Sequence, residues 1–316
     1  MADGSTTYPR GWFVVCWSTD LPQQGVLSLE YFGQHMVAFR GEDGVARVLE
    51  GYCAHMGASL SQGKVIGNDI ECPFHAWRFC GSGECTVIPY SKKIPPRARQ
   101  RAFEVVEKNG VVMIWHDELG RAPDFEIPDI AEFGSDEWLP WQVSQYTIKT
   151  HPREIVDNLA DKAHFPRVHS TEIDDFAFDV DGIRATQRVK GRAALANGGV
   201  DNFSSSTTYH GPGYLLMRMD GVLSNYMLLA HTPIGENLLH LRMGVMLKIV
   251  GSKAKTEGYV SLYLDNLKQG FEDDMKIWEK KIYRDPPLIC EGDGPIGHLR
   301  RWYKQFYATP AEGAST

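Results

Sequence analysis

Two short segments of the sequence each pair a cysteine with a histidine. Cys53 and His55 are separated by one residue, and Cys72 and His75, sixteen residues further on, are separated by two. Thiolates and imidazoles bind iron and zinc in many proteins. One centre that needs this mixture is a 2Fe–2S cluster in which one iron keeps two thiolates and the other takes two imidazoles. Exchanging two anionic thiolates for neutral imidazoles makes the cluster less negative and raises its reduction potential.

A closed zinc site is the main alternative for these four residues, because two cysteines and two histidines also suit tetrahedral zinc. Zinc fingers usually space their two histidines as neighbours on one helix, whereas here each histidine accompanies a cysteine. The pattern therefore favours a Rieske-type cluster. Gly57, Gly63 and Gly67 allow tight backbone around such a cluster, and Trp77 offers an apolar wall with one N–H donor.

A second set of candidate ligands lies between Asp157 and His169. Asp157, Asp161 and His164 are spaced four and then three residues apart, which places them on one face of a predicted helix. Pro166 is expected to end that helix, and His169 lies just beyond, free to turn back toward His164. Two histidines and a carboxylate from elsewhere form the facial triad that holds non-haem Fe(II) with open positions for dioxygen.

Asp273 and Asp274 both offer the missing carboxylate. Periodicity favours Asp274, which is three residues after Phe271 and four before Trp278 and therefore points with the apolar face of a predicted helix. A carboxylate on an apolar face is costly unless something compensates it, and a metal does. Asp273 is expected to be solvated. Taken alone, these residues also fit a hydrogen-bonded core histidine and a solvated acidic face; the cluster motif favours iron, because a one-electron cluster needs a partner that consumes electrons.

The cysteine–histidine pairs lie in a region of short apolar runs separated by Gly, Asp and Asn, from residue 11 to about residue 117. Runs of this length bounded by turn signals are typical of an antiparallel β domain. Asn109-Gly110 is expected to form a hairpin turn in which both residues have positive φ. The apolar runs are residues 12–17, 36–39, 45–49, 65–70, 103–106 and 111–115.

The pattern changes after a Pro-rich, charged stretch at residues 120–140, which is expected to be a linker or a domain-crossing segment. A helix is predicted after Pro152, which suits a first helical turn. A second helix is predicted at residues 256–283, where Leu264, Leu267, Phe271, Met275, Trp278 and Ile282 fall on one face. Strand-like runs at residues 203–219, 222–232 and 238–250 predict a broad sheet.

The sequence therefore predicts an α+β protein with two domains. Residues 1–120 form an antiparallel β domain that binds the cluster. Residues 121–316 form a catalytic domain in which a curved antiparallel sheet is flanked by helices and holds the mononuclear iron.

Composition excludes several classes of function. A hydrophobic fraction of 43% and a charged fraction of 23% are those of a globular protein, and a net charge of −7 argues against a nucleic-acid or anionic-membrane partner. No run approaches the ~18 uncharged apolar residues that a membrane span requires. The first ten residues lack the apolar stretch of a secretory signal, so we expect a cytoplasmic protein whose six cysteines are reduced thiols or metal ligands.

The segment Gly292-Asp-Gly294-Pro-Ile-Gly297 matches a dinucleotide-binding fingerprint. It lies near the C-terminus with no βαβ unit around it, and an Asp within the loop would repel a pyrophosphate. We therefore reject it as a nucleotide site. Since no flavin or nicotinamide fold is visible elsewhere, electrons must come from another protein.

Both sets of ligands together resemble the terminal oxygenase (α) subunit of the Rieske non-haem iron oxygenases, over nearly the whole chain. The resemblance implies a Rieske domain followed by a catalytic domain of helix-grip type, and a ring-shaped homotrimer. It assigns Asp161 as the bridging carboxylate that hydrogen-bonds a cluster histidine of the neighbouring subunit and carries electrons to the iron. The implied ligands are Cys53 and Cys72 on one cluster iron, His55 and His75 on the other, and His164, His169 and Asp274 on the mononuclear Fe(II).

Local segments narrow this resemblance to the 3-ketosteroid 9α-hydroxylase oxygenases. They include Cys72-Pro-Phe-His-Ala-Trp-Arg78, Val87-Ile-Pro-Tyr90 and Glu291-Gly-Asp-Gly-Pro-Ile296. The resemblance implies a monooxygenase that uses O₂ and electrons from an NAD(P)H-dependent reductase or a ferredoxin to hydroxylate a bulky hydrophobic substrate. It also places Phe271 and Trp278 at the substrate. Sterol 7-desaturases and aromatic-acid O-demethylases of the same superfamily remain alternatives.

Two readings outside oxygenase chemistry also stay open. One is an electron-transfer or lipid-binding protein with a Rieske cluster but no mononuclear iron. The other is a structural zinc protein. Metal and acid-labile sulfide contents separate the three, since only the oxygenase needs both a cluster and an extractable Fe(II).

Overall fold

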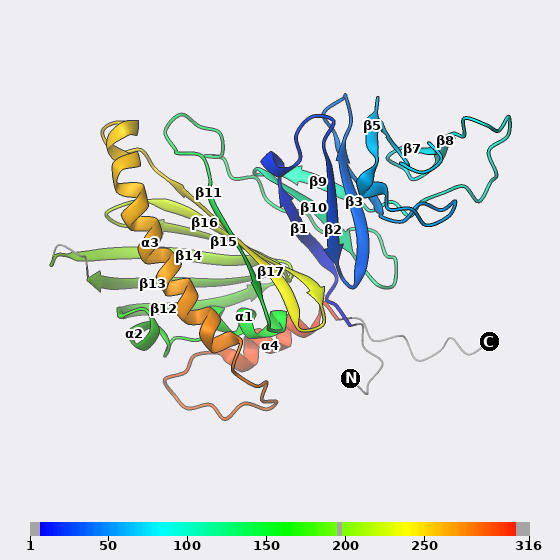
Figure 1. Cartoon of the computed structure of the whole chain (residues 1–316). Helices are drawn as coiled ribbons and strands as arrows, with labels where there is room; N and C mark the ends of the chain where they lie inside the picture. The colour runs from blue at the N-terminus through cyan, green and yellow to red at the C-terminus, as the bar shows by residue number, and fades with distance from the viewer. Residues whose placement is uncertain (1–6, 195–197, 308–316) are drawn as a thin grey trace. The chain divides into compact units, whose positions relative to one another are not determined.

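The computed structural model describes residues 7–194 and 198–307, and it divides into two compact units (Figure 1). Within the described residues, the N-terminal unit comprises Arg10–Asp129 with Ile234–Glu236, and the C-terminal unit comprises residues 7–9, Ile130–Pro233 and residues 237–307. None of the helices in the described ranges is long and apolar enough to cross a membrane.

The N-terminal unit consists of three small sheets, ordered β1-β10-β9, β2-β3-β4 and β5-β6-β7-β8. All their pairings are antiparallel, so the predicted antiparallel β domain is confirmed. The strands are β1 (Gly11–Trp17), β2 (Val26–Tyr31), β3 (Gln34–Arg40), β4 (Ala46–Glu50), β5 (Lys64–Ile66), β6 (Asp69–Glu71), β7 (Arg78–Phe79), β8 (Cys85–Val87), β9 (Val105–Lys108) and β10 (Val111–His116). Two single 3-10 turns, η1 (Ser18–Asp20) and η2 (Leu60–Gln62), complete the unit.

Two turns of this unit illustrate how glycine directs the chain. The predicted hairpin is confirmed, with φ of 55° at Asn109 and 80° at Gly110. The apolar run at residues 65–70, predicted as one strand, is instead a second hairpin, because Gly67 adopts a φ of 63° and reverses the chain. Val65 and Ile70 therefore face each other across β5 and β6.

A hydrophobic core lies directly behind the cysteine–histidine loops. It contains residues from β3, β4, β6 and β7, among them Phe39, Leu49 and Phe79, together with Cys53 and Cys72 themselves. The cysteines are thus anchored in the core, and the loops that carry them are held by two different sheets.

The C-terminal unit is built on a seven-stranded sheet with the order β11-β17-β16-β15-β14-β13-β12. Consecutive strands from β12 to β16 pair as antiparallel hairpins, and β11 pairs antiparallel with β17. The strands are β11 (Gln142–Ile148), β12 (Thr171–Asp181), β13 (Arg184–Ala194), β14 (Val200–His210), β15 (Tyr214–Asp220), β16 (Asn225–Gly235) and β17 (Leu238–Leu247).

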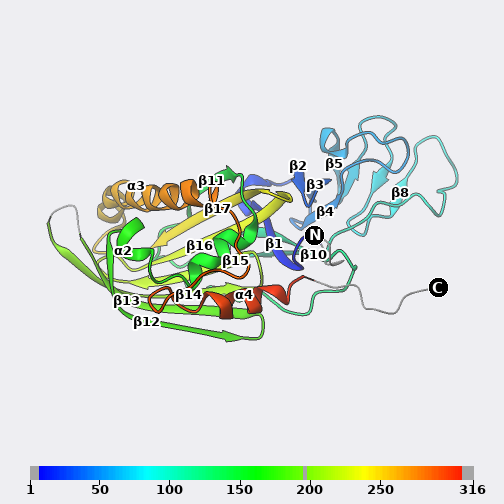
Figure 2. The same cartoon turned by 90° about the horizontal axis from the view of Figure 1, so that it is seen from below.

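The helices of this unit are short, with one exception. The long helix α3 runs across the sheet in Figure 1 and forms a separate layer above strands β12–β14 in Figure 2. It begins at the N-cap Ser252, whose hydroxyl accepts a hydrogen bond from the Lys255 N–H. The elements are α1 (Pro152–Val156), the 3-10 turn η3 (Asp157–Leu159), α2 (Phe165–Val168), α3 (Lys253–Trp278) and α4 (Ile296–Lys304). The predicted α+β fold is confirmed.

Several local features of this unit differ from the predictions. The apolar run at residues 203–219 is not one strand, because the chain turns at Gly211, with a φ of 78°, between β14 and β15. Strands β12 and β13 are not predicted from apolar runs. Their exposed faces are charged and form cross-strand ion pairs such as Arg188–Asp179. Their signal is alternation rather than apolar runs.

The predicted extension of the second helix to residue 283 is also wrong, since α3 ends at Trp278. The Trp278 carbonyl accepts a hydrogen bond from the Thr150 hydroxyl at 3.0 Å, and the Glu279 carboxylate accepts one from the Lys149 N–H at 3.1 Å. Groups from the chain after β11 thus occupy the helix end in place of a further turn.

Candidate metal centres

The first cysteine–histidine loop is closed by its own main chain. The Cys53 N–H donates to the Ala58 carbonyl at 2.8 Å, and the Cys53 carbonyl accepts from the Gly57 N–H at 2.8 Å. Gly57 has a φ of 76°, a conformation that suits glycine. His55 lies inside this turn, so its ring is presented from a short, internally bonded loop.

The second loop repeats the same pattern. The Cys72 N–H donates to the Trp77 carbonyl at 2.8 Å, and the Cys72 carbonyl accepts from the Ala76 N–H at 3.1 Å. Ala76 stands where the first loop has a glycine and has a φ of 55°, a left-handed conformation that costs energy for alanine. The two hydrogen bonds maintain this strained turn, which carries His75.

The four side chains converge. Cys53 and Cys72 are each 3% exposed, and the His55 and His75 rings lie 4.7 Å apart. Burial, reinforced by the neighbouring Cys72 thiol, raises the pKa of Cys53 to about 11. The Nδ1 atoms of both histidines are buried without a hydrogen-bond partner among the described residues, although buried polar atoms are normally paired. Two unpaired imidazole nitrogens beside two buried thiols fit a two-iron cluster with mixed ligands.

Two residues that the motif does not reveal support these loops. Gln100, 3% exposed, accepts from the Ala54 N–H at 3.0 Å and donates to the Tyr52 carbonyl at 2.7 Å. Tyr90 accepts a hydrogen bond from the Trp77 indole at 2.7 Å, and the same indole stacks on His55 with ring centroids 4.4 Å apart. Both residues lie beyond the motif in sequence, so spacing carries no signal for them.

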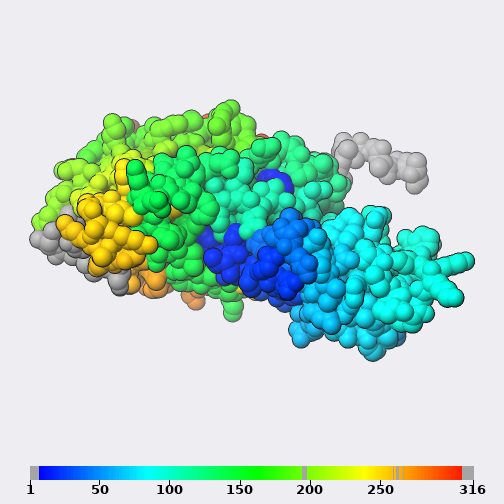
Figure 3. Space-filling view, turned by 90° about the horizontal axis from the view of Figure 1, so that it is seen from above, coloured from blue at the N-terminus to red at the C-terminus, as the bar shows by residue number. Residues whose placement is uncertain are grey.

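The segment after residue 85 is also prominent on the surface. Residues 90–97 are exposed and project from the N-terminal unit (cyan in Figure 3). Tyr90, which holds the Trp77 indole, thus belongs to a projecting loop rather than to the core.

The helix expected to carry Asp157, Asp161 and His164 on one face is wrong. α1 and η3 end at Leu159, residues 160–164 are not helical, and Pro166 lies in the first turn of α2 instead of ending the first helix. The chain leaves the helix because the Lys162 N–H donates to the Asp293 carbonyl, at 3.0 Å, and not to an acceptor one turn earlier.

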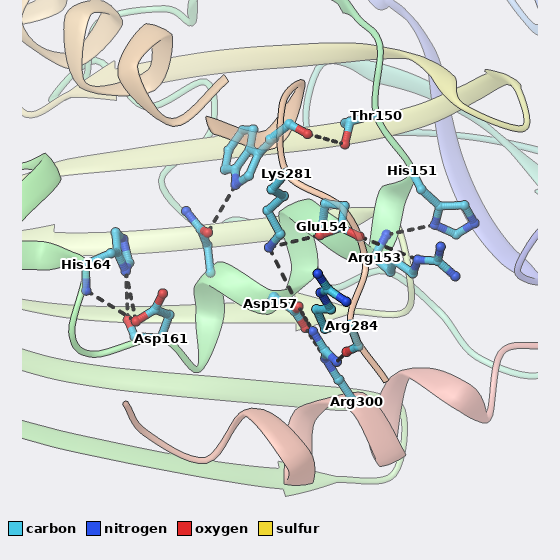
Figure 4. A network of polar contacts seen from close by, with 12 residues as sticks. Thr150, His151, Arg153, Glu154, Asp157, Asp161, His164, Lys281, Arg284 and Arg300 are labelled. Carbon is cyan, nitrogen blue, oxygen red and sulfur yellow. Dashed lines mark hydrogen bonds and ion pairs between the residues drawn. The ribbon is translucent and has the colours of Figure 1, made fainter. Parts of the chain in front are cut away.

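Asp157 consequently points away from the histidines. Arg300 binds both of its carboxylate oxygens, at 3.1 and 2.6 Å (Figure 4). Lys281 lies 2.9 Å from the buried Glu154 carboxylate and 3.8 Å from Asp157. A buried ion network, and not a metal, thus compensates the Asp157 charge.

His164, His169 and Asp274 do come together. One possible ligand atom from each lies within 4.8 Å of the others, and the His169 Nε2 is 3.4 Å from an Asp274 oxygen. Asp274 is 7% exposed. Asp273, the alternative carboxylate, is partly exposed and forms a 2.8 Å ion pair with Lys276. The donor set of two imidazoles and one carboxylate is the set that suits non-haem Fe(II).

Asp161 orients His164 through its main chain. The His164 Nδ1 lies 2.9 Å from the Asp161 carbonyl, and the His164 N–H donates to the Asp161 carboxylate at 3.2 Å (Figure 4). A carbonyl only accepts, so Nδ1 carries the proton and Nε2 keeps its lone pair for a metal. Although burial opposes it, the hydrogen bonds from His164 lower the pKa of the Asp161 carboxyl.

The two residues predicted at the substrate occupy different environments. Phe271 is partly buried, one turn before Asp274. Trp278 is 3% exposed and its indole donates to the Asn158 side chain at 3.1 Å. Trp278 therefore joins α3 to η3, and its contact with a substrate stays a prediction, as does that of Phe271.

Both the N-terminal and the C-terminal part of the chain match known protein families. Residues 11–108 match the Rieske 2Fe–2S domain, which implies such a cluster, and residues 114–307 match the 3-ketosteroid 9α-hydroxylase C-terminal domain. The chain is 37% identical to a 3-ketosteroid-9-alpha-monooxygenase oxygenase component of Rhodococcus rhodochrous, over 97% of this chain and 83% of that protein. A protein of the same name from Mycobacterium tuberculosis is 34% identical, over 97% and 84%.

A solved structure of dicamba monooxygenase bound to dicamba has the same fold, with a TM-score of 0.78, 19% identity and coverage of 96% of this chain and 98% of that one. The family models and the relatives agree that this chain is the oxygenase component of a monooxygenase. The chain therefore belongs to the Rieske oxygenases, in the family of the 3-ketosteroid 9α-hydroxylase oxygenase components.

Proposed function

We propose that this oxygenase hydroxylates a bulky apolar substrate of the 3-ketosteroid class. In this proposal Cys53, His55, Cys72 and His75 hold the cluster within residues 1–120, and His164, His169 and Asp274 hold a mononuclear Fe(II) within residues 121–316. The observation that carries it is the approach of three ligand atoms to within 4.8 Å of one another, from the two residues that flank α2 and from α3. When bound, the cluster would deliver single electrons and the Fe(II) would offer open positions for O₂.

The chain's own residues prepare this second centre in two ways. The Asp161 carbonyl engages the His164 Nδ1, which leaves Nε2 as the ring nitrogen available to a metal. Asp274 is buried on α3 next to His169, where its charge requires a cation. Neutral imidazoles with one carboxylate leave a divalent cation with a net positive charge.

In the proposed homotrimer, electrons pass from a cluster histidine of a neighbouring subunit through the Asp161 carboxylate to the mononuclear iron. Asp161 is suited to this role because its carboxylate is partly exposed, with 35% of the side chain accessible, while its main chain holds His164. The donor would be an NAD(P)H-dependent reductase or a ferredoxin. All six cysteines are free thiols, which suits a reducing cytoplasm.

The proposal of a bulky substrate is supported by an apolar face of the seven-stranded sheet. Asn225, which pairs with Met219 across β16 and β15, donates to the Tyr263 hydroxyl of α3 at 2.7 Å. Directly opposed residues of neighbouring strands point to the same face. The face that contains Met219 is therefore the one that faces α3.

Several apolar side chains on this face are only partly buried. Ile173 on β12 and Phe203 on β14 both lie directly opposite Gly191 on β13. Met217 and Met219 lie on the neighbouring strand β15. Apolar groups this large are normally buried when a core is complete. A partly filled apolar layer facing α3, the helix that carries Asp274, suits a rigid hydrocarbon substrate oriented by few polar contacts.

The test is turnover with a surrogate reductase under ¹⁸O₂. Parallel samples receive a 3-ketosteroid, a sterol and a methoxylated aromatic acid, and products are identified by mass spectrometry. We expect one ¹⁸O atom in a hydroxylated 3-ketosteroid. Conversion of only the sterol or only the aromatic acid would overturn the substrate assignment.

Metal analysis tests the proposed centres separately. About three irons and about two sulfides per chain are expected, of which about one iron is removed by a chelator. A chain with zinc and no acid-labile sulfide, or one with a cluster and no extractable iron, would contradict the proposal.

A further inference from the structure

The glycine-rich segment that fails as a nucleotide site lies against the segment that leads to the candidate iron ligands. The Asp293 carbonyl accepts the Lys162 N–H at 3.0 Å, immediately after Asp161. The neighbouring Gly294 packs so closely on Ala160 that a Cβ at Gly294 would lie 2.2 Å from the Ala160 carbonyl oxygen. The loop thus touches the main chain on both sides of Asp161.

The loop has its own internal bonds that hold it in this conformation. The Asp293 carboxylate accepts from the Cys290 N–H at 2.7 Å, and the Asp293 N–H donates to the Cys290 carbonyl at 3.2 Å. Gly294 has a φ of 95°, which side-chain-bearing residues rarely adopt. Gly292, two residues earlier, has open space where a Cβ would be. Only the second glycine is therefore required by the contact.

The residues just before this contact are held from three other elements. The carboxylate of Asp157 is bound by Arg300 of α4 (Figure 4), and Asn158 accepts from the Trp278 indole at the end of α3. The Leu159 carbonyl accepts from the Gln187 side chain of β13 at 2.8 Å. The contacts of Gly294 with Ala160 and of Asp293 with Lys162 then hold the chain on both sides of Asp161, just before His164.

We propose that Gly294 and Asp293 are positioning residues for the iron centre. They hold the main chain at Ala160 and Lys162, so that the Asp161 carbonyl meets the His164 Nδ1 and leaves the His164 Nε2 available to bind a metal together with His169 and Asp274. The inference rests on the proposed mononuclear site and adds the residues that pre-arrange it. Pre-arrangement of this kind lowers the cost of ordering the ligands when a metal binds.

The test compares Gly294→Ala with the matched variant Gly292→Ala in the full-length, cluster-loaded protein. After removal of the chelatable iron, Fe(II) is titrated back anaerobically, and the 2Fe–2S absorbance is recorded in the same samples. We expect Gly294→Ala to weaken Fe(II) binding by about 10- to 100-fold, the usual effect of losing a support of a metal ligand, with an unchanged cluster spectrum. Gly292→Ala should stay within about 2-fold of the wild type, because its Cβ meets no neighbour.

Equal Fe(II) affinity in the two glycine variants would overturn the inference. If Gly294→Ala does not accumulate as folded protein, Asp293→Ala decides, because it removes only the side-chain bond to Cys290. Weaker Fe(II) binding with an intact cluster then supports the inference, and unchanged binding overturns it. A wild type that binds no third iron would instead refute the proposed iron site, so the two failures are distinguishable.

Discussion

The two candidate metal centres are constructed in different ways. The four cluster ligands come from two loops close in sequence, and each loop is closed by its own main-chain hydrogen bonds. The ligands of the second centre come from α2 and α3, with strands β12–β17 between them in sequence. The segment at residues 157–160, which leads to His164, is held by the Arg300 and Gln187 side chains and by Gly294. The first centre depends on local turn geometry, and the second depends on the completed fold.

The largest expected effect separates the two centres directly. His75→Ala removes one imidazole from the second loop, and a cluster with three ligands is not expected to persist. The Rieske absorbance and EPR signal should disappear, while chelatable Fe(II) binding in the C-terminal unit should be retained. Met56→Ala is the control, because the Met56 side chain in the first loop is exposed. A persistent Rieske signal in His75→Ala would refute the ligand assignment.

The dependence of the second centre on distant residues predicts a large effect of Arg300→Ala. This change leaves the Asp157 carboxylate buried without its bidentate partner, which should cost about 3 kcal/mol or more in the free energy of unfolding. Fe(II) binding should weaken as well, whereas the cluster spectrum should not change. Urea denaturation and Fe(II) titration measure the two effects.

The control for Arg300→Ala is Arg188→Ala, which removes an ion pair whose two side chains are more than half exposed. Such a pair contributes less than about 1 kcal/mol. If both variants lose similar stability, the ion network at Asp157 is not a major contributor to the free energy of unfolding.

Acid should affect the C-terminal unit more than the N-terminal unit. Burial lowers the pKa of His231 to about 3 and the pKa values of His151 and His210 to about 4, whereas the N-terminal unit has His116, also lowered to about 4. At a pH below the ordinary histidine pKa of 6.5, these histidines are protonated in the unfolded chain but stay neutral in the folded protein. Stability is therefore complete above about pH 6.5 and falls toward pH 4, by up to about 1.4 kcal/mol per pH unit for each group.

Thermal unfolding of the chain followed between pH 7 and pH 4.5 checks this sign. His231→Gln should reduce the slope, because glutamine can still bond the Tyr209 hydroxyl that lies 3.1 Å from the His231 ring but does not titrate. A variant with the wild-type slope would show that His231 does not contribute to the acid sensitivity.

The smallest expected effect concerns the surroundings of the cluster. Tyr90→Phe removes the acceptor of the Trp77 indole N–H, a hydrogen bond worth about 1 kcal/mol. Because both loops close their own turns, the cluster should still assemble fully, with a slightly lower melting temperature of the N-terminal unit. Loss of the cluster in Tyr90→Phe would mean that the loops are not self-sufficient and would remove the contrast between the two centres.

The sequence alone was sufficient for much of the N-terminal unit and for the identity of the candidate ligands. Apolar runs located β1, β3, β4, β9 and β10, and Asn109-Gly110 located a hairpin, because these signals act between residues close in the chain. Helical periodicity also distinguished the buried Asp274 from the partly exposed Asp273. The roles of these residues as metal ligands remain predictions.

Only the tertiary structure decided where the first helix of the C-terminal unit stops and which acidic residue faces the histidines. The spacing of Asp157, Asp161 and His164 fits a helix, but the Asp293 carbonyl takes the Lys162 N–H, Gly294 packs on Ala160, and Arg300 binds Asp157. The physical reason is that a short helical segment is marginal by itself, so partners from distant parts of the chain determine its end. Local spacing cannot predict such partners. The structural role of the glycine-rich segment at residues 292–297 could therefore be inferred only from the fold, which places this segment beside Asp161.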